Sequence, residues 1–448
     1  MRDHDRQNER ELSPDSALIR AVGVWGLAAA IVNITVGGGI FRLPSSVAGS
    51  LGAAAPIAYV VCAIAMGLIV ICFAEAGSRV SLTGGPYAYV EVAFGPFIGF
   101  VSGVLLWAGL TAALAAVTSF FTDALAALLP FLNSTPARVA VMLLILTALT
   151  TLNVRGVRNA SRFNAVMTVA KLLPLVLLVC LGAFAVRRGN LVWQYAPSPS
   201  AVARSAAVLV FAFLGVETAL VPSGEVKDPA RTVPRAVFLA IAGIAVLYIA
   251  VQFVSQGVLG ASLATTKNPV ADAGGAALGQ WGRELILIGS AVSMFGYVSG
   301  MTLAVPRMLF AFARDGFLPR IVASVHPRFR TPHVAIVIQV ALVAVLAATG
   351  SFERLAIIAN GSVLLVYAAC CLATVQLRRR DVRSGGIPFR VPGASVAPWL
   401  ALAVIAGLLA MLQQVEWLAL LIVAAAAVSV YVLTRSKRAA AVVAPAGD

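Results

Sequence analysis

Long apolar stretches separated by short polar segments run along almost the whole chain. Twelve of them approach or exceed the length that a helix needs to cross the apolar part of a bilayer, about 20 residues. They lie at residues 22–46, 53–76, 96–128, 137–153, 163–186, 203–222, 236–260, 284–312, 333–349, 355–377, 396–414 and 417–434. We predict a helix in each, because a lipid-exposed backbone must satisfy its own hydrogen bonds and the stretches do not alternate like barrel strands. The predicted fold class is an all-α polytopic membrane protein with 12 transmembrane helices.

The composition supports lipid as the solvent of this protein. Hydrophobic residues make up 60% of the 448 positions, and charged residues make up 11%, against roughly 25% in soluble domains. This excludes a protein built mainly around a soluble core. The formal charge of +15 could indicate a nucleic-acid partner, but the basic residues lie mostly in short segments between apolar stretches. Nucleic-acid binding needs them gathered on one water-facing patch, so we expect no such partner.

The distribution of basic residues predicts the orientation in the membrane. If the N-terminus is inside, the predicted inner segments hold 24 of the 33 Lys and Arg residues and the outer segments hold seven. Positive residues are enriched on the cytoplasmic side of membrane proteins. We therefore expect a multi-pass protein of the cell (inner, cytoplasmic) membrane with both termini cytoplasmic.

The sequence offers no pattern typical of a metal site, a cofactor site or a catalytic centre. The histidines lie in the N-terminal tail or beside loops, and the cysteines lie inside apolar stretches without paired spacing. Neither arrangement provides a metal cluster, and no nucleophile lies beside a base. We predict that the protein is not an enzyme and that it has no cofactor.

The first stretch is interrupted by three successive glycines, Gly37, Gly38 and Gly39, followed by Pro44. Each glycine costs about 1 kcal/mol in a helix interior, so we expect the helix to stop near Gly37 and restart after Gly39. The freed N–H groups and the positive end of the helix dipole would then suit a carboxylate near the membrane centre. The alternative is close helix packing through small residues.

The sixth stretch carries an ionisable residue, Glu217, two positions after Gly215. Such residues are costly in a membrane and usually face a cavity or a partner, so Glu217 is a candidate for proton exchange. A structural hydrogen bond that pins a broken helix is the alternative, and both could hold. Gly38 and Gly215 each lie in the first of five consecutive stretches. Paired interruptions in two inverted halves indicate a transporter site.

Lys171 is the only lysine inside a predicted span. It lies too deep to reach the surface easily, so it could titrate or stand where a cation would otherwise bind. The alternative is a lysine tethered to backbone carbonyls of the broken first span. Three further charged residues are interpreted as structural: Arg42 would reach the outer vestibule, Asp123 could pair with an outer arginine, and Glu75 would form an interfacial ion pair with Arg79.

Four segments together resemble the amino acid-polyamine-organocation superfamily of amino acid permeases. They are GGGIFRLP, TGGPYAYVEVAFGPFIGF (83–100), FAFLGVETALVPSGEVKDPARTVPRAV (211–237) and PRMLFAFARDGFLP (306–319). The resemblance implies a LeuT-like 5+5 inverted repeat plus two extra helices. It divides the chain into a cytoplasmic tail (1–20), a transport core (21–378), the last two helices with their preceding loop (379–434) and a second cytoplasmic tail (435–448).

The resemblance also implies the residues of a substrate site. Backbone N–H groups of the glycine run would bind the substrate carboxylate, and carbonyls around Phe211 to Leu214 would bind the α-amino group, with the Phe211 ring as a gate. The substrate-binding residues expected on this basis are Gly37, Gly38, Gly39, Ile40, Phe211, Ala212, Leu214, Gly109, Leu110, Met301 and Ser362, with Leu114 and Asn360 as further neighbours of the substrate side chain.

Lys171 matches a lysine that, in sodium-independent members of the superfamily, occupies the place of a sodium ion. The resemblance therefore implies a secondary active amino acid transporter that works by alternating access. We expect sodium-independent, proton-coupled uptake of a neutral amino acid, with Lys171 and Glu217 as coupling residues. The alternatives are an antiporter that exchanges an amino acid for its metabolic product, such as an amine, and a polytopic membrane enzyme. The expected partners are the amino acid, protons and the lipid bilayer, and the oligomeric state is open between monomer and homodimer.

Overall fold

The computed structural model describes residues 22–80, 85–155, 160–193, 195–220, 226–329, 331–383, 387–390, 393 and 395–443. Over these residues the regular structure is helical, with one isolated parallel β-bridge between Val22 and Val226. Nine helical stretches of this described part are long and apolar enough to cross a membrane, and three shorter apolar helices accompany them. The prediction of an all-α polytopic membrane protein is confirmed.

Each of the twelve predicted stretches overlaps one or two helices. The helices of at least nine residues are α2 (Val24–Thr35), α3 (Gly39–Leu51), α4 (Ala55–Arg79), α5 (Pro86–Phe94), α6 (Pro96–Leu128), α7 (Thr135–Arg155), α8 (Ala160–Gly182), α9 (Pro199–Phe213), α11 (Pro229–Leu259), α12 (Pro269–Leu278), α13 (Gln280–Ala304), α14 (Pro306–Arg314), α15 (His333–Thr349), α16 (Phe352–Arg379), α17 (Ala397–Leu409) and α18 (Gln414–Val443). A helix of four residues, α10 (Val216–Ala219), follows α9, and short 3-10 turns join several of the others.

Proline and serine set many helix starts. A proline occupies the first or second position of α4, α5, α6, α9, α11, α12, α14 and α17, where its missing N–H costs no intrahelical hydrogen bond. Ser198 caps α9 by accepting from Ala201 N at 3.2 Å, and Ser351 caps α16 by accepting from Arg354 N at 3.3 Å. Such caps satisfy N–H groups that the first turn of a helix leaves free.

The structure differs most from the predicted boundaries in two places. The stretch 284–312 is divided between α13 and α14, because Pro306 removes a backbone donor and its ring starts a new helix. The last helix, α18, continues to Val443 and so includes part of the predicted tail 435–448. The predicted tail 1–20 and the last residues, 444–448, lie outside the described residues.

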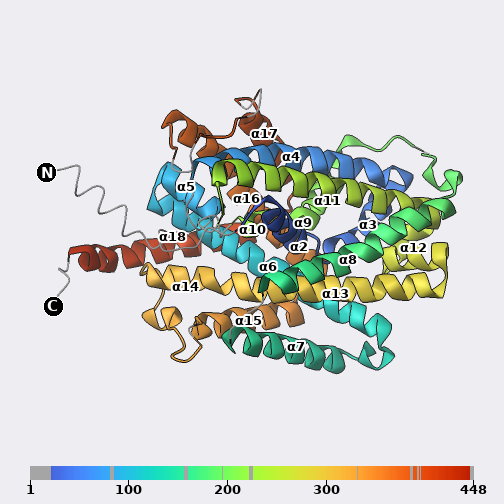
Figure 1. Cartoon of the computed structure of the whole chain (residues 1–448), viewed down its shortest axis with the longest axis horizontal. Helices are drawn as coiled ribbons and strands as arrows, with labels where there is room; N and C mark the ends of the chain where they lie inside the picture. Colours follow the sequence, from blue (N-terminus) through green and yellow to red (C-terminus); the bar gives the residue numbers. More distant parts are fainter. Residues whose placement is uncertain are drawn as a thin grey trace.

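The long helices pack around a centre of short, broken ones (Figure 1). In Figure 1 the label of α2 lies near the middle of the bundle, close to those of α9 and α10. Helix α2 packs against α8, α10, α11 and α13, and α9 packs against α3, α4 and α16. Helices α5 and α14 lie at one end of the molecule and α12 lies at the opposite end. The broken helices are therefore enclosed on several sides by the longest ones.

Candidate functional site

The first stretch is interrupted at the glycine run. Helix α2 ends at Thr35, and α3 begins at Gly39. The first backbone hydrogen bonds of α3 are donated by Phe41 and Arg42 to Gly38 O, both at 3.2 Å. The N–H groups just before them belong to the first turn, which has no intrahelical acceptor. The predicted break is confirmed, and it presents the positive end of α3 toward the centre of the bundle.

The second break lies at Gly215. Helix α9 ends at Phe213, and α10 begins at Val216, with Leu214 and Gly215 between them. Gly215 has a φ of 122°, a conformation that side chains with a Cβ rarely adopt. The sequence prediction of an interruption beside this glycine is confirmed.

The two breaks touch. A Cβ on Gly39 would lie 3.0 Å from Ala212 Cα and 3.3 Å from the Phe211 ring. A Cβ on Gly215 would lie 2.9 Å from the backbone carbon of Ile34, just before the first break. Glycine is therefore required at both positions by space, and segments far apart in the sequence share one site.

Lys171 holds the end of α2. Its amine donates to Asn33 O at 2.6 Å and to Val36 O at 2.9 Å, and the side chain is completely buried. Ser293 of α13 donates a third hydrogen bond, from Oγ to Val36 O at 3.0 Å. The carbonyl end of a helix is the negative end of its dipole, so an ammonium group there is favourable. The tether that sequence analysis gave as the structural alternative is present.

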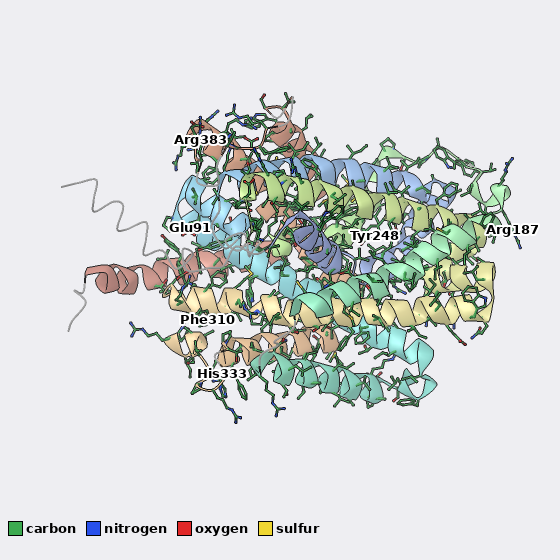
Figure 2. All side chains as sticks on the ribbon, in the orientation of Figure 1. Glu91, Arg187, Tyr248, Phe310, His333 and Arg383 are labelled. Atoms are coloured by element: carbon green, nitrogen blue, oxygen red, sulfur yellow. The ribbon has the colours of Figure 1, made fainter. Side chains whose placement is uncertain are left out.

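Tyr248 of α11 contacts both breaks. Its hydroxyl lies 3.0 Å from Ala212 O and 3.4 Å from Thr35 O, and the side chain is buried near the centre of the bundle (Figure 2). A phenol carries a single proton, so it donates fully to one carbonyl at a time. Tyr248 therefore links the ends of α2 and α9.

Glu217 pins the second break. Its Oε1 accepts from Gly215 N at 3.0 Å, and its Oε2 accepts from the Tyr367 hydroxyl of α16 at 2.6 Å. The carboxylate is completely buried, and no ion pair to it is found among the described residues. The structural hydrogen bond considered for Glu217 is present, and it does not exclude proton exchange.

Aromatic rings cover the site on the side of α3. The Phe211 ring meets Phe352 edge-on at a centroid distance of 5.3 Å, and Phe352 lies 5.5 Å from Phe120. Next to Phe352, Glu353 pairs with Arg42 at 3.1 Å, and Arg42 also donates to the carbonyl of Lys267 at 2.8 Å. The Phe211 side chain therefore packs against Phe352 beside the two breaks.

The ion pairs predicted from sequence are present, but one is deeper than expected. Asp123 pairs with Arg138 at 2.7 Å. Glu75 accepts from Arg79 at 3.0 Å and also from Arg378 of α16 at 2.5 Å. Both Glu75 and Arg79 are buried, because the end of α16 and the segment after it cover them. The predicted pair between Glu75 and Arg79 is confirmed, and it is covered by other parts of the protein.

Asp381, two residues after the end of α16, adds a second carboxylate beside Arg79. Asp381 Oδ1 lies 4.0 Å from Arg79, and a hydrogen bond from Arg383 lowers the pKa of the Asp381 carboxyl. Asp381 therefore stays charged near Arg79, one of the two arginines that share Glu75.

The residues expected around the substrate side chain lie on α6, α13 and α16. A Cβ on Gly109 would lie 3.0 Å from Ser362 Cβ, so these two positions are neighbours where α6 meets α16. Asn360 donates to Ala207 O of α9 at 3.0 Å. Leu110 and Met301 are buried, as are Leu114 and Ile40. On α13, the side chains that approach Gly37 and Gly38 are Tyr297 and Met294.

The sequence did not predict five residues of the site: Tyr248, Ser293, Tyr367, Met294 and Tyr297. Each comes from a helix distant in sequence, and nothing in its local pattern distinguishes it from an ordinary core residue. A polar or aromatic residue within an apolar helix was the only available signal. Among the described residues, no group of three or more His, Cys, Asp or Glu could hold a metal ion.

Comparison with known proteins agrees with this geometry. The amino acid permease family model matches residues 22–432. The chain is 28% identical to the methylthioribose transporter of Bacillus subtilis (strain 168), over 95% of each chain. It is 28% identical to the branched-chain amino acid permease BcaP of the same organism, over 87% of each chain. It is 26% identical to the serine/threonine exchanger SteT, also from that organism, over 87% of this chain and 90% of the relative.

A broken-helix site in a multi-pass membrane protein and a family match over nearly the whole chain lead to one conclusion. The protein is a transporter of an amino acid or a related small molecule rather than an enzyme, and it belongs to the amino acid permease family.

Proposed function

We propose that this permease is a secondary active transporter that works by alternating access. Its 12 transmembrane helices would form a LeuT-like 5+5 inverted repeat plus two extra helices. The repeat would lie in the transport core (21–378) and the two extra helices in 379–434, with tails at 1–20 and 435–448. The observation that carries this proposal is the contact between the breaks at Gly39 and Gly215. Both breaks lie in the first of five consecutive spans, which is typical of inverted-repeat carriers. Both termini would be cytoplasmic, and the protein would lie in the cytoplasmic membrane.

The substrate we propose is a neutral amino acid. Its carboxylate would accept hydrogen bonds from the first-turn N–H groups of α3, from Gly38 to Ile40, at the positive end of that helix. Its amino group would bind carbonyls between Phe211 and Leu214. The side chains that a Cβ on the glycines of the two breaks would meet are apolar or aromatic, among them Ile34, Phe120, Phe211, Met294 and Tyr297. A charged substrate side chain would find poor solvation among them.

The coupling we propose is sodium-independent and uses protons. The Lys171 ammonium already supplies a positive charge to the carbonyls of Asn33 and Val36, which would otherwise be available to a metal cation. Lys171 and Glu217 are the ionisable residues in contact with the two breaks, so they are the candidates to gain and lose the coupled proton. The likeness to the serine/threonine exchanger SteT favours obligate exchange as the second candidate.

Uptake by the purified protein in proteoliposomes tests these proposals together. Labelled neutral amino acids would be supplied with an inward proton gradient, with sodium, or with unlabelled substrate inside the vesicles. We expect the proton gradient to stimulate uptake and sodium to have no effect. Stimulation only by internal substrate would favour exchange, and stimulation by sodium would contradict the proposal.

Two controls make the assay specific for the site. Gly38→Val would push methyl groups toward the Phe120 ring, which lies 3.1 Å from the position of a Cβ on Gly38. We expect this variant to insert normally and to lose substrate binding. Unlabelled methylthioribose is the second control, since one relative is named a methylthioribose transporter. If it competes and neutral amino acids do not, the proposed substrate class is wrong.

A further inference from the structure

A stripe of polar side chains lies in the interface between α4 and α11. Tyr59 comes from α4, and Gln252, Ser255 and Gln256 come from α11; each is at most 1% exposed. Tyr248, Gln252 and Ser255 recur at helical spacing, so they lie on one face of α11. Helix α4 packs along α11 and runs antiparallel to it, because a Cβ on Gly77 would lie 2.9 Å from the Val233 side chain and the turn Gly52–Ala54 before α4 contacts the turn Gly260–Thr265 after α11. This arrangement places Tyr59 beside the last turns of α11. The stripe therefore runs from the centre of the bundle toward the end of α11 at Leu259.

These side chains leave an unusual number of polar atoms without a partner. The Tyr59 hydroxyl, both amide atoms of Gln252, Ser255 Oγ and Gln256 Oε1 make no hydrogen bond to the described protein. The other amide atom of Gln256 donates to Gly260 O at 3.2 Å. Buried polar groups without partners are costly, most of all at membrane depth. Five such atoms at one helix interface indicate a shared ligand rather than five unrelated losses.

The chemistry of the stripe selects the ligand. Tyr59, Gln252 and Ser255 each offer a donor and an acceptor, and none of them is charged at neutral pH. A bound anion would favour a cationic donor, and a bound metal cation would favour a carboxylate. Water donates and accepts equally and is stable in a protein interior when it has two to four polar partners. We propose that the α4–α11 interface binds a cluster of internal water molecules.

The water cluster would serve Tyr248, which lies one helical turn from Gln252. The Tyr248 hydroxyl stands between the carbonyls of Ala212 and Thr35 but has one proton to give. When the broken helices move apart, one carbonyl loses this donor and needs another. Water held by the next turn of α11 can replace it. This second step rests on the proposed alternating-access function, whereas the binding of water does not.

Radiolytic labelling of the full-length protein in lipid nanodiscs tests the water cluster directly. Short X-ray pulses create hydroxyl radicals from bound water, which oxidise the side chains beside it. Phe73 is the internal control, because it lies on the same helix as Tyr59 and is equally buried, among apolar and aromatic neighbours. We expect Tyr59 to be oxidised about tenfold faster than Phe73, since only Tyr59 would touch water. Equal rates would overturn the proposal.

Two variants separate water from other ligands and from structural effects. Gln252→Leu combined with Ser255→Ala removes the polar partners at nearly constant volume, so Tyr59 oxidation should fall to the Phe73 level. Val254→Ala is the matched control, since an apolar space stays dry and Tyr59 oxidation should not change. Unchanged oxidation in the double variant would contradict the proposal. A further measurement replaces sodium or chloride in the buffer by other ions. If Tyr59 oxidation then changes, the ligand is an ion, and the proposed water cluster is wrong.

Uptake by Gln252→Leu tests the link to Tyr248. We expect its maximal rate to fall about fivefold with little change in substrate affinity, because water supports the movement and not the binding step. An unchanged rate together with lost Tyr59 oxidation would leave the water cluster standing and remove its role in transport. If the unmodified protein shows no uptake of any neutral amino acid, the proposed function is wrong, whatever the variants show.

Discussion

The two helix breaks are stabilised by opposite charges. At the first break, the Lys171 ammonium donates to carbonyls at the end of α2. At the second, the Glu217 carboxylate accepts from the backbone N–H of Gly215, at the start of α10. A helix dipole is negative at its carbonyl end and positive at its N–H end, so each charge lies at the helix end that suits it.

This difference shows how a membrane protein keeps broken helices in lipid. Every backbone group freed by a break must find a partner inside the protein, because the bilayer provides none. The first break uses Lys171, Ser293 and Tyr248, all from other helices. The second uses Glu217 from its own segment and two outside groups, Tyr367 and the shared Tyr248. The first break therefore depends more on neighbouring helices, and the second depends more on its own sequence.

Gly215→Ala should give the largest effect, because it attacks the second break through its own backbone. The φ of 122° is unfavourable for alanine, and the new Cβ would lie 2.9 Å from the backbone carbon of Ile34. We expect a loss of stability of about 3 kcal/mol and no measurable uptake. Thermal unfolding in detergent and proteoliposome uptake measure both. Gly67→Ala is the control, since a Cβ there has open space; equal effects of the two variants would show that the second break is not strained.

Lys171→Met should give the next largest effect and tests the first break. Methionine keeps much of the buried stem volume but removes the amine, leaving the carbonyls of Asn33 and Val36 without this donor. We expect a loss of about 2 kcal/mol and a strong fall in uptake. Leu173→Met, at an exposed position of the same helix, should change neither. If Lys171→Met keeps full stability and proton-stimulated uptake, the amine neither holds the break nor takes part in coupling.

Glu217→Gln tests whether the second charge also titrates. Glutamine can keep the hydrogen bond from Gly215, but it stays neutral at every pH and so imitates the protonated acid. If protonated Glu217 is the form that transports, wild-type uptake should fall as pH rises. Uptake by the variant should not fall, and at every pH it should stay near the rate that the wild type shows at low pH. Uptake measured across the neutral range decides this.

Tyr367→Phe is the matched control for Glu217→Gln. It removes one hydrogen bond, worth about 1 kcal/mol, and leaves the carboxylate in place. It should therefore lower stability and keep the pH dependence. Identical pH profiles for wild type and Glu217→Gln would leave this residue a structural role only.

The sequence was sufficient to locate both breaks but not to identify most of their partners. Glycine is costly in a helix, so the run at Gly37–Gly39 and the single Gly215 marked the interruptions directly. Lys171 and Glu217 were recognisable because a charge inside an apolar stretch is rare. Tyr248 and Ser293 carry no such signal, because their role depends on which carbonyl a distant helix brings to them. For the same reason the sequence did not identify Arg378 as the second partner of Glu75. The division of the eighth stretch, in contrast, could have been predicted from Pro306.

Tyr248→Phe should give the smallest effect and tests whether the two breaks act as one unit. Phenylalanine keeps the edge-on contact with the Phe213 ring, at a centroid distance of 5.3 Å, and removes only the hydroxyl. The expected loss of stability is about 1 kcal/mol, smaller than for Lys171→Met, because Lys171 and Ser293 still hold α2. If Tyr248 couples the breaks, combining Tyr248→Phe with Lys171→Met should cost a different amount from the sum of the single changes. Strict additivity would mean that each break is held independently, and the comparison between them would then describe two separate sites.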